Sequence, residues 1–279
     1  MKKMTVLTMA FLMVAFLSAN VSAYTFLPDT YDNITISDEN DKDANWYRDQ
    51  EDQEVEPGMA RDQSWDLEAF VWDESASSLS MIGGYDFDTT GYQDTVSGDI
   101  FIDVDGDAIF GDIHNEQTVK NAVVEDTYGY DYVLDMDFTN FTYDVYALGE
   151  DSRTQTAYYK QNQGSNPWRY YDGGTLLAED ISFGYTEGMT DAEAGYGLTG
   201  GSHNVVEGLD LSLLSTDIPL DFYVHFTMQC GNDNLMGEGS LAAMAPPEDP
   251  TATPEPATML LLGFGLVGLA TLRKRFAKN

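Results

Sequence analysis

The chain has 279 residues, which is enough for one large domain or two small ones. Its formal net charge at pH 7 is −35. Its single cysteine, Cys230, excludes an internal disulfide. Seven of the 13 basic residues and 47 of the 48 acidic residues lie between Tyr24 and Thr253, so this segment has a net charge of −40. A surface this acidic repels nucleic acid and anionic lipid headgroups. It suits an exterior rich in salt or divalent cations, although solubility alone explains the charge equally well.

The first predicted element is a secretory signal peptide over residues 1–23. A basic start, Met1–Lys3, precedes the almost wholly apolar run Met4–Leu17 and the small, polar exit Ser18–Ala23. This order of regions predicts cleavage after Ala23. A buried N-terminal helix would need neither the lysines nor the small-residue exit. We therefore expect the protein to be exported.

Residues 24–60 are rich in Asp, Glu and Asn and show little periodicity. They predict an irregular acidic N-terminal arm, with one short strand at Asn33–Ser37.

Period-two alternation, typical of β-strands, begins at Trp65 and marks residues 61–243 as the body. The clearest case is residues 128–148, where Tyr130, Leu134 and Phe138 share one predicted face and Asp135 lies on the other. Thr139 and Asn140 would form the turn. Similar alternation occurs in residues 65–72, 98–107, 180–186, 209–214 and 221–228. About ten short strands separated by Gly-rich breaks favour a mainly β fold, a β-sandwich or jelly-roll-like body.

One loop suggests an ion. In "DVDGDAIFGD", Asp103, Asp105 and Asp107 alternate, and Gly106 permits a tight bend that brings their oxygens together. Ca²⁺ takes six to eight hard oxygen ligands, and Asp112 could complete the shell. The glycine position and the absence of predicted flanking helices distinguish the loop from an EF-hand. An ordinary Asp-Gly turn after a strand explains the same residues, and both interpretations remain open.

No catalytic residue is predicted. His225, Cys230 and Asp233 contain the side chains of a nucleophilic triad, but they lie within nine residues of one another, and a strand, a turn and a packed cysteine explain them better. Three scattered histidines and one cysteine offer no zinc-ligand pair.

Two features keep a role in carbohydrate chemistry open. The aromatic side chains of Trp46, Trp168, Tyr170 and Tyr171 could stack on sugar rings, although burial in a core is the commoner role for such residues. Paired carboxylates could hydrolyse glycosides, but among 48 acidic residues chance pairs are frequent.

The chain after residue 243 changes character. Residues 244–256 form a Pro-rich linker that ends in Pro254-Glu255-Pro256. The 15 uncharged residues Thr258–Leu272 would form a helix of about 22 Å, which is short for a bilayer core of about 30 Å. The stems of Arg273 and Lys274 extend its reach. The pattern of residues 257–279 thus predicts a single transmembrane helix followed by a basic tail. The basic cluster Arg273-Lys274-Arg275 would lie on the cytoplasmic side.

The Pro-Glu-Pro motif, the Gly-containing apolar helix and the basic cluster together resemble the PEP-CTERM sorting signal. The resemblance implies recognition by an exosortase in a Gram-negative bacterium that makes exopolysaccharide, with an inner-membrane precursor processed near Pro254–Pro256. Body segments such as "WDLEAF" (65–70) and "HFTMQCGNDNLMGEG" (225–239) are similar to a group of exosortase-dependent surface proteins.

We therefore expect a non-enzymatic surface or extracellular-matrix protein, exported, sorted by an exosortase and associated with exopolysaccharide. The expected cofactor is Ca²⁺ or none. Two alternatives remain: a carbohydrate-binding module on the same fold, and a secreted glycan hydrolase that uses carboxylates.

Overall fold

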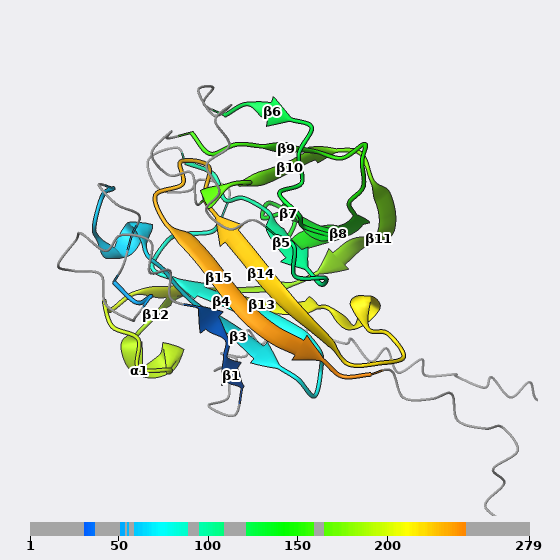
Figure 1. Ribbon diagram of the computed structural model, residues 1–279. Helices are drawn as coiled ribbons and strands as arrows, with labels where there is room; N and C mark the ends of the chain where they lie inside the picture. Colours follow the sequence, from blue (N-terminus) through cyan, green and yellow to red (C-terminus); the bar gives the residue numbers. More distant parts are fainter. Residues whose placement is uncertain are drawn as a thin grey trace, which may run out of the picture.

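The computed structural model describes residues 31–36, 51–53, 55, 59–88, 95–108, 121–158 and 165–243. These residues form antiparallel β-sheets with a few short helical turns, so the prediction of a mainly β body is confirmed (Figure 1). The predicted cleavage site at Ala23, the linker and the predicted transmembrane helix 257–279 lie outside the described residues. Within the described ranges, no helix has the length and apolar character needed to cross a bilayer.

Two large sheets dominate the described part of the chain, and all their strand pairs are antiparallel. In spatial order, the five-stranded sheet contains β1 (Asp32–Asn33), β3 (Leu67–Asp73), β4 (Ser78–Gly83), β13 (His203–Asp210) and β12 (Gly184–Met189). The seven-stranded sheet contains β11 (Thr175–Ser182), β8 (Thr142–Ala147), β7 (Tyr132–Asp137), β5 (Ile100–Asp103), β14 (Leu220–Thr227), β15 (Asn234–Leu241) and β2 (Thr35–Ile36).

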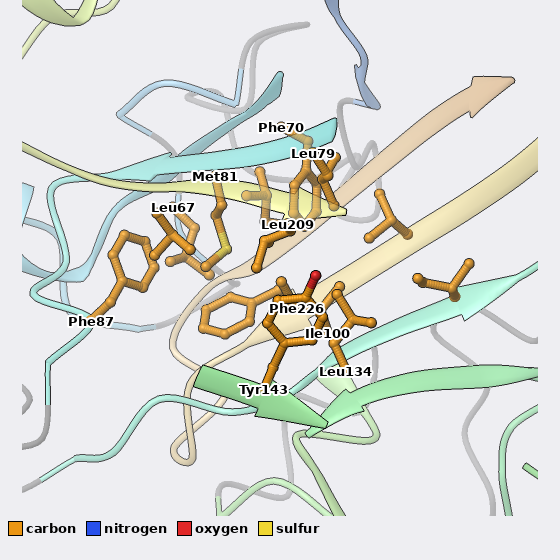
Figure 2. Close-up of a cluster of buried hydrophobic side chains, with 14 of the residues drawn as sticks. Leu67, Phe70, Leu79, Met81, Phe87, Ile100, Leu134, Tyr143, Leu209 and Phe226 are labelled. Atoms are coloured by element: carbon orange, nitrogen blue, oxygen red, sulfur yellow. The ribbon is translucent and has the colours of Figure 1, made fainter. Parts of the chain in front are cut away.

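The inner faces of these two sheets share one hydrophobic core. Phe70 of β3 and Leu209 of β13 belong to the same buried cluster as Ile100, Leu134 and Phe226 of the other sheet. Figure 2 shows these side chains pointing toward one another between the strands. The aromatic rings interlock: Phe226 meets Phe87 edge-on, with ring centroids 5.7 Å apart. Alternate residues of each strand therefore bury a continuous apolar layer, as the period-two pattern predicts.

A third, small sheet covers part of the outer face of the seven-stranded sheet. It contains β10 (Arg169–Asp172), β9 (Arg153–Gln155) and β6 (Val123–Val124), which lie at the top of Figure 1. Beneath it, Phe101, Tyr130, Val133 and Tyr170 form a second buried cluster. Residues on both faces of β5 and β7 are therefore buried, which a simple alternation of buried and exposed residues does not predict.

Two positions near β7 and β8 differ from the predicted faces. Tyr130 packs in the second cluster and not beside Leu134, because a turn with a hydrogen bond from Tyr130 N to Thr127 O precedes β7. Phe141 adopts a positive φ of 53° in the turn before β8 and is 37% exposed, so it does not continue the alternation of Tyr143 and Val145.

The N-terminal segment 31–36 pairs with both large sheets. β1 pairs with β3, and β2 pairs with β15. Residues 51–53 also contact the body, since the backbone N–H of Gln53 donates to Asp66. The described parts of the arm are therefore built into the fold.

The strand β15 has two glycines, Gly237 and Gly239, that let it approach its neighbour β14. A Cβ at Gly239 would lie 2.5 Å from the ring of Phe222, and one at Gly237 would lie 3.0 Å from Val224. Glycine is unfavourable in strands unless close approach requires it. Here it leaves room for core side chains of β14.

Short helical turns connect the strands. Among the described residues they include the 3₁₀ turn Gln63–Trp65, the single-turn α1 (Asp191–Ala194) and the 3₁₀ turn Ser212–Leu214. The first of these leads directly into β3, which places Asp66 immediately before that strand and Glu68 at its second position.

Candidate functional site

A polar cavity of about 490 Å³ opens where β7, β8 and β11 meet the segment before β5. Six carboxylates and one guanidinium line it: Asp88, Asp99, Asp135, Asp137, Asp144, Asp180 and Arg169. We call it the acidic pocket. Its concave shape and its convergent polar groups are features of ligand-binding sites.

Several of these carboxylates organise the backbone around the acidic pocket. Asp99 is buried, and its two oxygens accept the N–H groups of Met136 and Tyr170 at 2.9 and 2.8 Å. Asp137 accepts N–H groups within the turn after β7, and Asp144 accepts the N–H of Asp180 at 2.8 Å. These aspartates hold the strand ends that form the rim.

Asp135 differs from these aspartates, because it faces another negatively charged side chain. It lies directly opposite Asp144 in the β7–β8 ladder, and like charges at such positions destabilise a sheet. Burial and the charge of Asp144 raise the pKa of Asp135, while Arg169 acts in the opposite direction. Burial and the charge of Asp135 also raise the pKa of Asp99 well above its usual range. An arrangement that costs stability and shifts the pKa of its members is typical of a binding or catalytic site.

The loop that the sequence marked as a calcium candidate has a defined structure as far as residue 108. Asp103 is buried, and its oxygens accept the N–H groups of Asp105, Gly106 and Ala108 at 3.0, 2.8 and 3.0 Å. We call residues 103–108 the acidic loop. Its hydrogen bonds explain why an aspartate stands at the end of β5, whether or not an ion binds.

The acidic loop brings together part of the predicted ligand set. Carboxylate oxygens of Asp103, Asp105 and Asp131 lie within 4.8 Å of one another, while Asp107 is not one of this group. The charge of Asp105 raises the pKa of Asp107. Asp131 was not predicted; it lies in the turn before β7, and its Oδ2 accepts the N–H of Val104 at 2.8 Å. Asp112 lies outside the described residues. Calcium binding by this loop stays a prediction.

The three residues weighed as a nucleophilic set have other hydrogen-bond partners. The His225 ring is buried; its Nε2 lies 3.1 Å from the carbonyl oxygen of Pro167, and burial lowers its pKa to about 4. Asp233 accepts the N–H of Leu67 at 2.5 Å and that of Asn234 at 2.9 Å. Burial raises the pKa of the Cys230 thiol to about 11. A protonated thiol and a neutral, backbone-bonded imidazole do not suit nucleophilic attack.

Two of the four candidate sugar-stacking aromatics are core residues. Trp168 is 2% exposed and donates its indole N–H to Asn121, and Tyr170 is 8% exposed in the second cluster. Tyr171 is 52% exposed, with the guanidinium of Arg153 5.0 Å from its ring centroid. Trp46 lies outside the described residues.

The sequence did not predict the surroundings of one buried histidine, His203. The ring of His203 in β13 lies between two carboxylates, with Nδ1 2.6 Å from Glu68 and Nε2 3.0 Å from Asp191. Glu68 and His203 are 135 residues apart in the chain. No local spacing could have indicated the pair.

The comparison with protein families identifies the tail. The PEP-CTERM protein-sorting motif matches residues 252–275, which include Pro254–Pro256 and Arg273–Arg275. The chain therefore carries a PEP-CTERM protein-sorting motif in its C-terminal segment. The motif indicates a secreted protein with a C-terminal sorting signal and implies processing by an exosortase, which is consistent with the surface of a Gram-negative bacterium. Comparisons with curated proteins and with solved structures give no match.

Proposed function

We propose that the chain is a non-enzymatic surface or matrix protein whose β-rich body associates with the exopolysaccharide of the cell that exports it. The observation that carries this proposal is the sorting motif at residues 252–275, since exosortase-dependent sorting delivers the body to the exterior. The acidity of the body agrees with it, because an acidic surface stays soluble and avoids anionic lipid and nucleic acid.

Locating the protein in cells with and without the exosortase tests the delivery. We expect the chain in the surface or matrix fraction of wild-type cells and in the inner membrane of exosortase-deficient cells. Equal surface amounts in the two strains would contradict the proposed route.

The acidic pocket supports a second candidate, a carbohydrate-binding module. Carboxylates and a guanidinium that converge on one cavity supply acceptors and donors for sugar hydroxyls, and Asp135 and Arg169 lie together there. We expect the full-length protein to bind the producer's own polysaccharide and Asp135→Ala to weaken this binding at least tenfold. Asp221→Ala, on an exposed part of β14, is the matched control and should bind as the wild type does.

A carboxylate-dependent hydrolase is the remaining candidate. It would need one carboxyl group as an acid and a second as a base or nucleophile. Two groups of the acidic pocket, Asp99 and Asp135, have a raised pKa, but Asp99 uses both oxygens to hold backbone N–H groups. Incubation with the same polysaccharide should therefore produce no new reducing ends. Their appearance with wild-type protein and loss in Asp135→Ala would establish the hydrolase instead.

A further inference from the structure

A second group of carboxylates lies where the N-terminal arm meets the beginning of β3. Asp66 and Glu68 are each 1% exposed, and Asp52, from the segment 51–53, is partly buried. One carboxylate oxygen from each of the three lies within 4.8 Å of the others. We call these three residues the buried carboxylate cluster.

Most oxygens of the buried carboxylate cluster have hydrogen-bond donors. Asp66 Oδ2 accepts both the backbone and the side-chain N–H groups of Gln53, at 3.0 and 3.1 Å. Glu68 accepts from Gln63 Nε2 and from His203 Nδ1, each at 2.6 Å. Asp52 Oδ2 accepts the N–H and the hydroxyl of Thr199, at 3.1 and 2.9 Å.

Asp66 Oδ1 is the exception. It is buried and has no hydrogen-bond partner among the described residues. A buried carboxylate oxygen without a donor costs free energy, and here the side chain also faces the charges of Glu68 and Asp52. This oxygen therefore points to a positively charged ligand.

The histidine next to the buried carboxylate cluster does not remove the surplus charge. Burial lowers the pKa of His203, but its contacts with Glu68 and Asp191 outweigh burial, so the pKa is raised. Each ring nitrogen meets a carboxylate oxygen, and an imidazolium donates to both. Its charge is thus shared between Glu68 and Asp191, whereas Asp66 receives only the neutral donors of Gln53 among the described groups.

We propose that Asp52, Asp66 and Glu68 bind a Ca²⁺ ion that fastens residues 51–53 of the arm to the beginning of β3. The donors are all hard oxygens, and both nitrogens of His203 already have partners, which argues against zinc. Three ligand atoms within 4.8 Å of one another fit around one ion whose bonds to oxygen are about 2.3–2.6 Å. Mg²⁺ demands a near-ideal octahedron and keeps several waters, which a buried cluster accommodates less readily.

The ion would join segments that are distant in the chain. Asp52 also contacts Thr199, and Gln63 donates to both Glu68 and the carbonyl oxygen of Ser202. One ion would therefore hold the arm, the first residues of β3 and the loop before β13 together. Because it binds the folded chain, it stabilises that state by mass action.

Calorimetric titration of the full-length protein, purified in detergent and stripped of metal, tests the proposal in about 0.15 M KCl, which screens nonspecific attraction. We expect saturable Ca²⁺ binding, weaker binding of Mg²⁺, and a higher thermal midpoint with Ca²⁺. Asp66→Asn should weaken the binding at least tenfold. Asp52→Asn changes a less buried residue, so it should fold as the wild type does and still lose the affinity. Circular dichroism checks the fold of each variant.

Two further variants locate the ion. Asp221→Asn removes the same charge from an exposed part of β14 and should bind as the wild type does. Asp105→Asn alters the acidic loop and should leave the proposed binding step intact. The proposal is overturned if wild-type protein binds no Ca²⁺, or if Asp105→Asn removes every binding step while Asp52→Asn removes none. In either case a proton shared between Asp66 and Glu68 explains the buried carboxylate cluster.

Discussion

The acidic loop and the buried carboxylate cluster place the same kind of side chain in opposite surroundings. In the acidic loop, Asp103 directs its oxygens to three backbone N–H groups, and Asp105 is exposed to water. In the buried carboxylate cluster, Asp66 and Glu68 are almost fully buried and one oxygen has no donor among the described residues.

The difference shows that the number of acidic residues does not decide whether a site needs a cation. What decides it is whether each buried oxygen has a donor. A loop aspartate that is saturated by its own backbone is stable alone. A carboxylate that is buried among others requires a proton or an ion.

The largest effect is expected from Glu68→Ala. The change leaves the buried imidazolium of His203 with one carboxylate partner, Asp191, in place of two. Removing one partner of a buried ion pair costs about 3–5 kcal/mol when the other charge is left alone. Because Asp191 remains, urea denaturation should show a loss of up to that size. Glu68→Gln keeps an acceptor for the imidazole N–H and should lose less. Equal, small losses in both variants would mean that the pair contributes little.

A pH-dependent effect on stability is expected from the ionisation of Asp66. Burial and the charge of Glu68 raise its pKa from 3.8 to about 9. A raised pKa contributes stability that is full below the unfolded value and disappears as the pH rises through the folded value. In metal-free buffer, stability should therefore fall between about pH 4 and pH 9.

Asp66→Asn is the control for this pH dependence, because the amide does not ionise. The variant should show a shallower decline than the wild type over the same range. Added Ca²⁺ should also flatten the wild-type curve, since the ion replaces the proton. A variant whose curve has the same slope as the wild type would place the titration elsewhere.

In the acidic loop, the buried Asp103 should contribute more to stability than the exposed Asp105. Asp103→Ala removes the acceptor of three backbone N–H groups at the end of β5, and an unsatisfied buried group costs about 1–3 kcal/mol. Thermal or urea unfolding in metal-free buffer should show this loss.

The smallest effect is expected from Asp105→Ala, within about 0.5 kcal/mol, because surface substitutions away from special features rarely exceed that. The residue is exposed and accepts one N–H, that of Asp107, at 3.2 Å. Measured in metal-free buffer, a loss as large as that of Asp103→Ala would erase the distinction between the two aspartates.

The mainly β body could be predicted because alternation is a local signal. The pattern around Leu134 and the strand 221–228 both appear in the structure, as β7 and β14. The strand β15 was not predicted, because Gly237 and Gly239 look like a break in the sequence. In the structure they give room to Val224 and Phe222 of β14. Such a requirement depends on a neighbouring strand and leaves no mark in the local pattern.

The functional features likewise divide into one that is local in the sequence and others that form only in the folded chain. The sorting tail is one contiguous segment, so its sequence alone predicted a PEP-CTERM sorting signal. The motif match confirms this prediction. The contacts of Glu68 with His203 and of Asp52 with Thr199 join residues 135 and 147 positions apart. The approach of Asp131 to Asp103 likewise arises from the turn before β7 meeting the end of β5. Only the folded chain brings these side chains together.

Mass spectrometry of the surface-released protein tests most directly whether the tail is a sorting signal that an exosortase processes. Cleavage near Pro254–Pro256 predicts that the released form contains no peptide beyond about residue 257, while exosortase-deficient cells retain the complete tail. Replacing Pro254, Glu255 and Pro256 should likewise keep the precursor in the inner membrane. Recovery of peptides from Phe264–Leu272 in the released protein would contradict the claim.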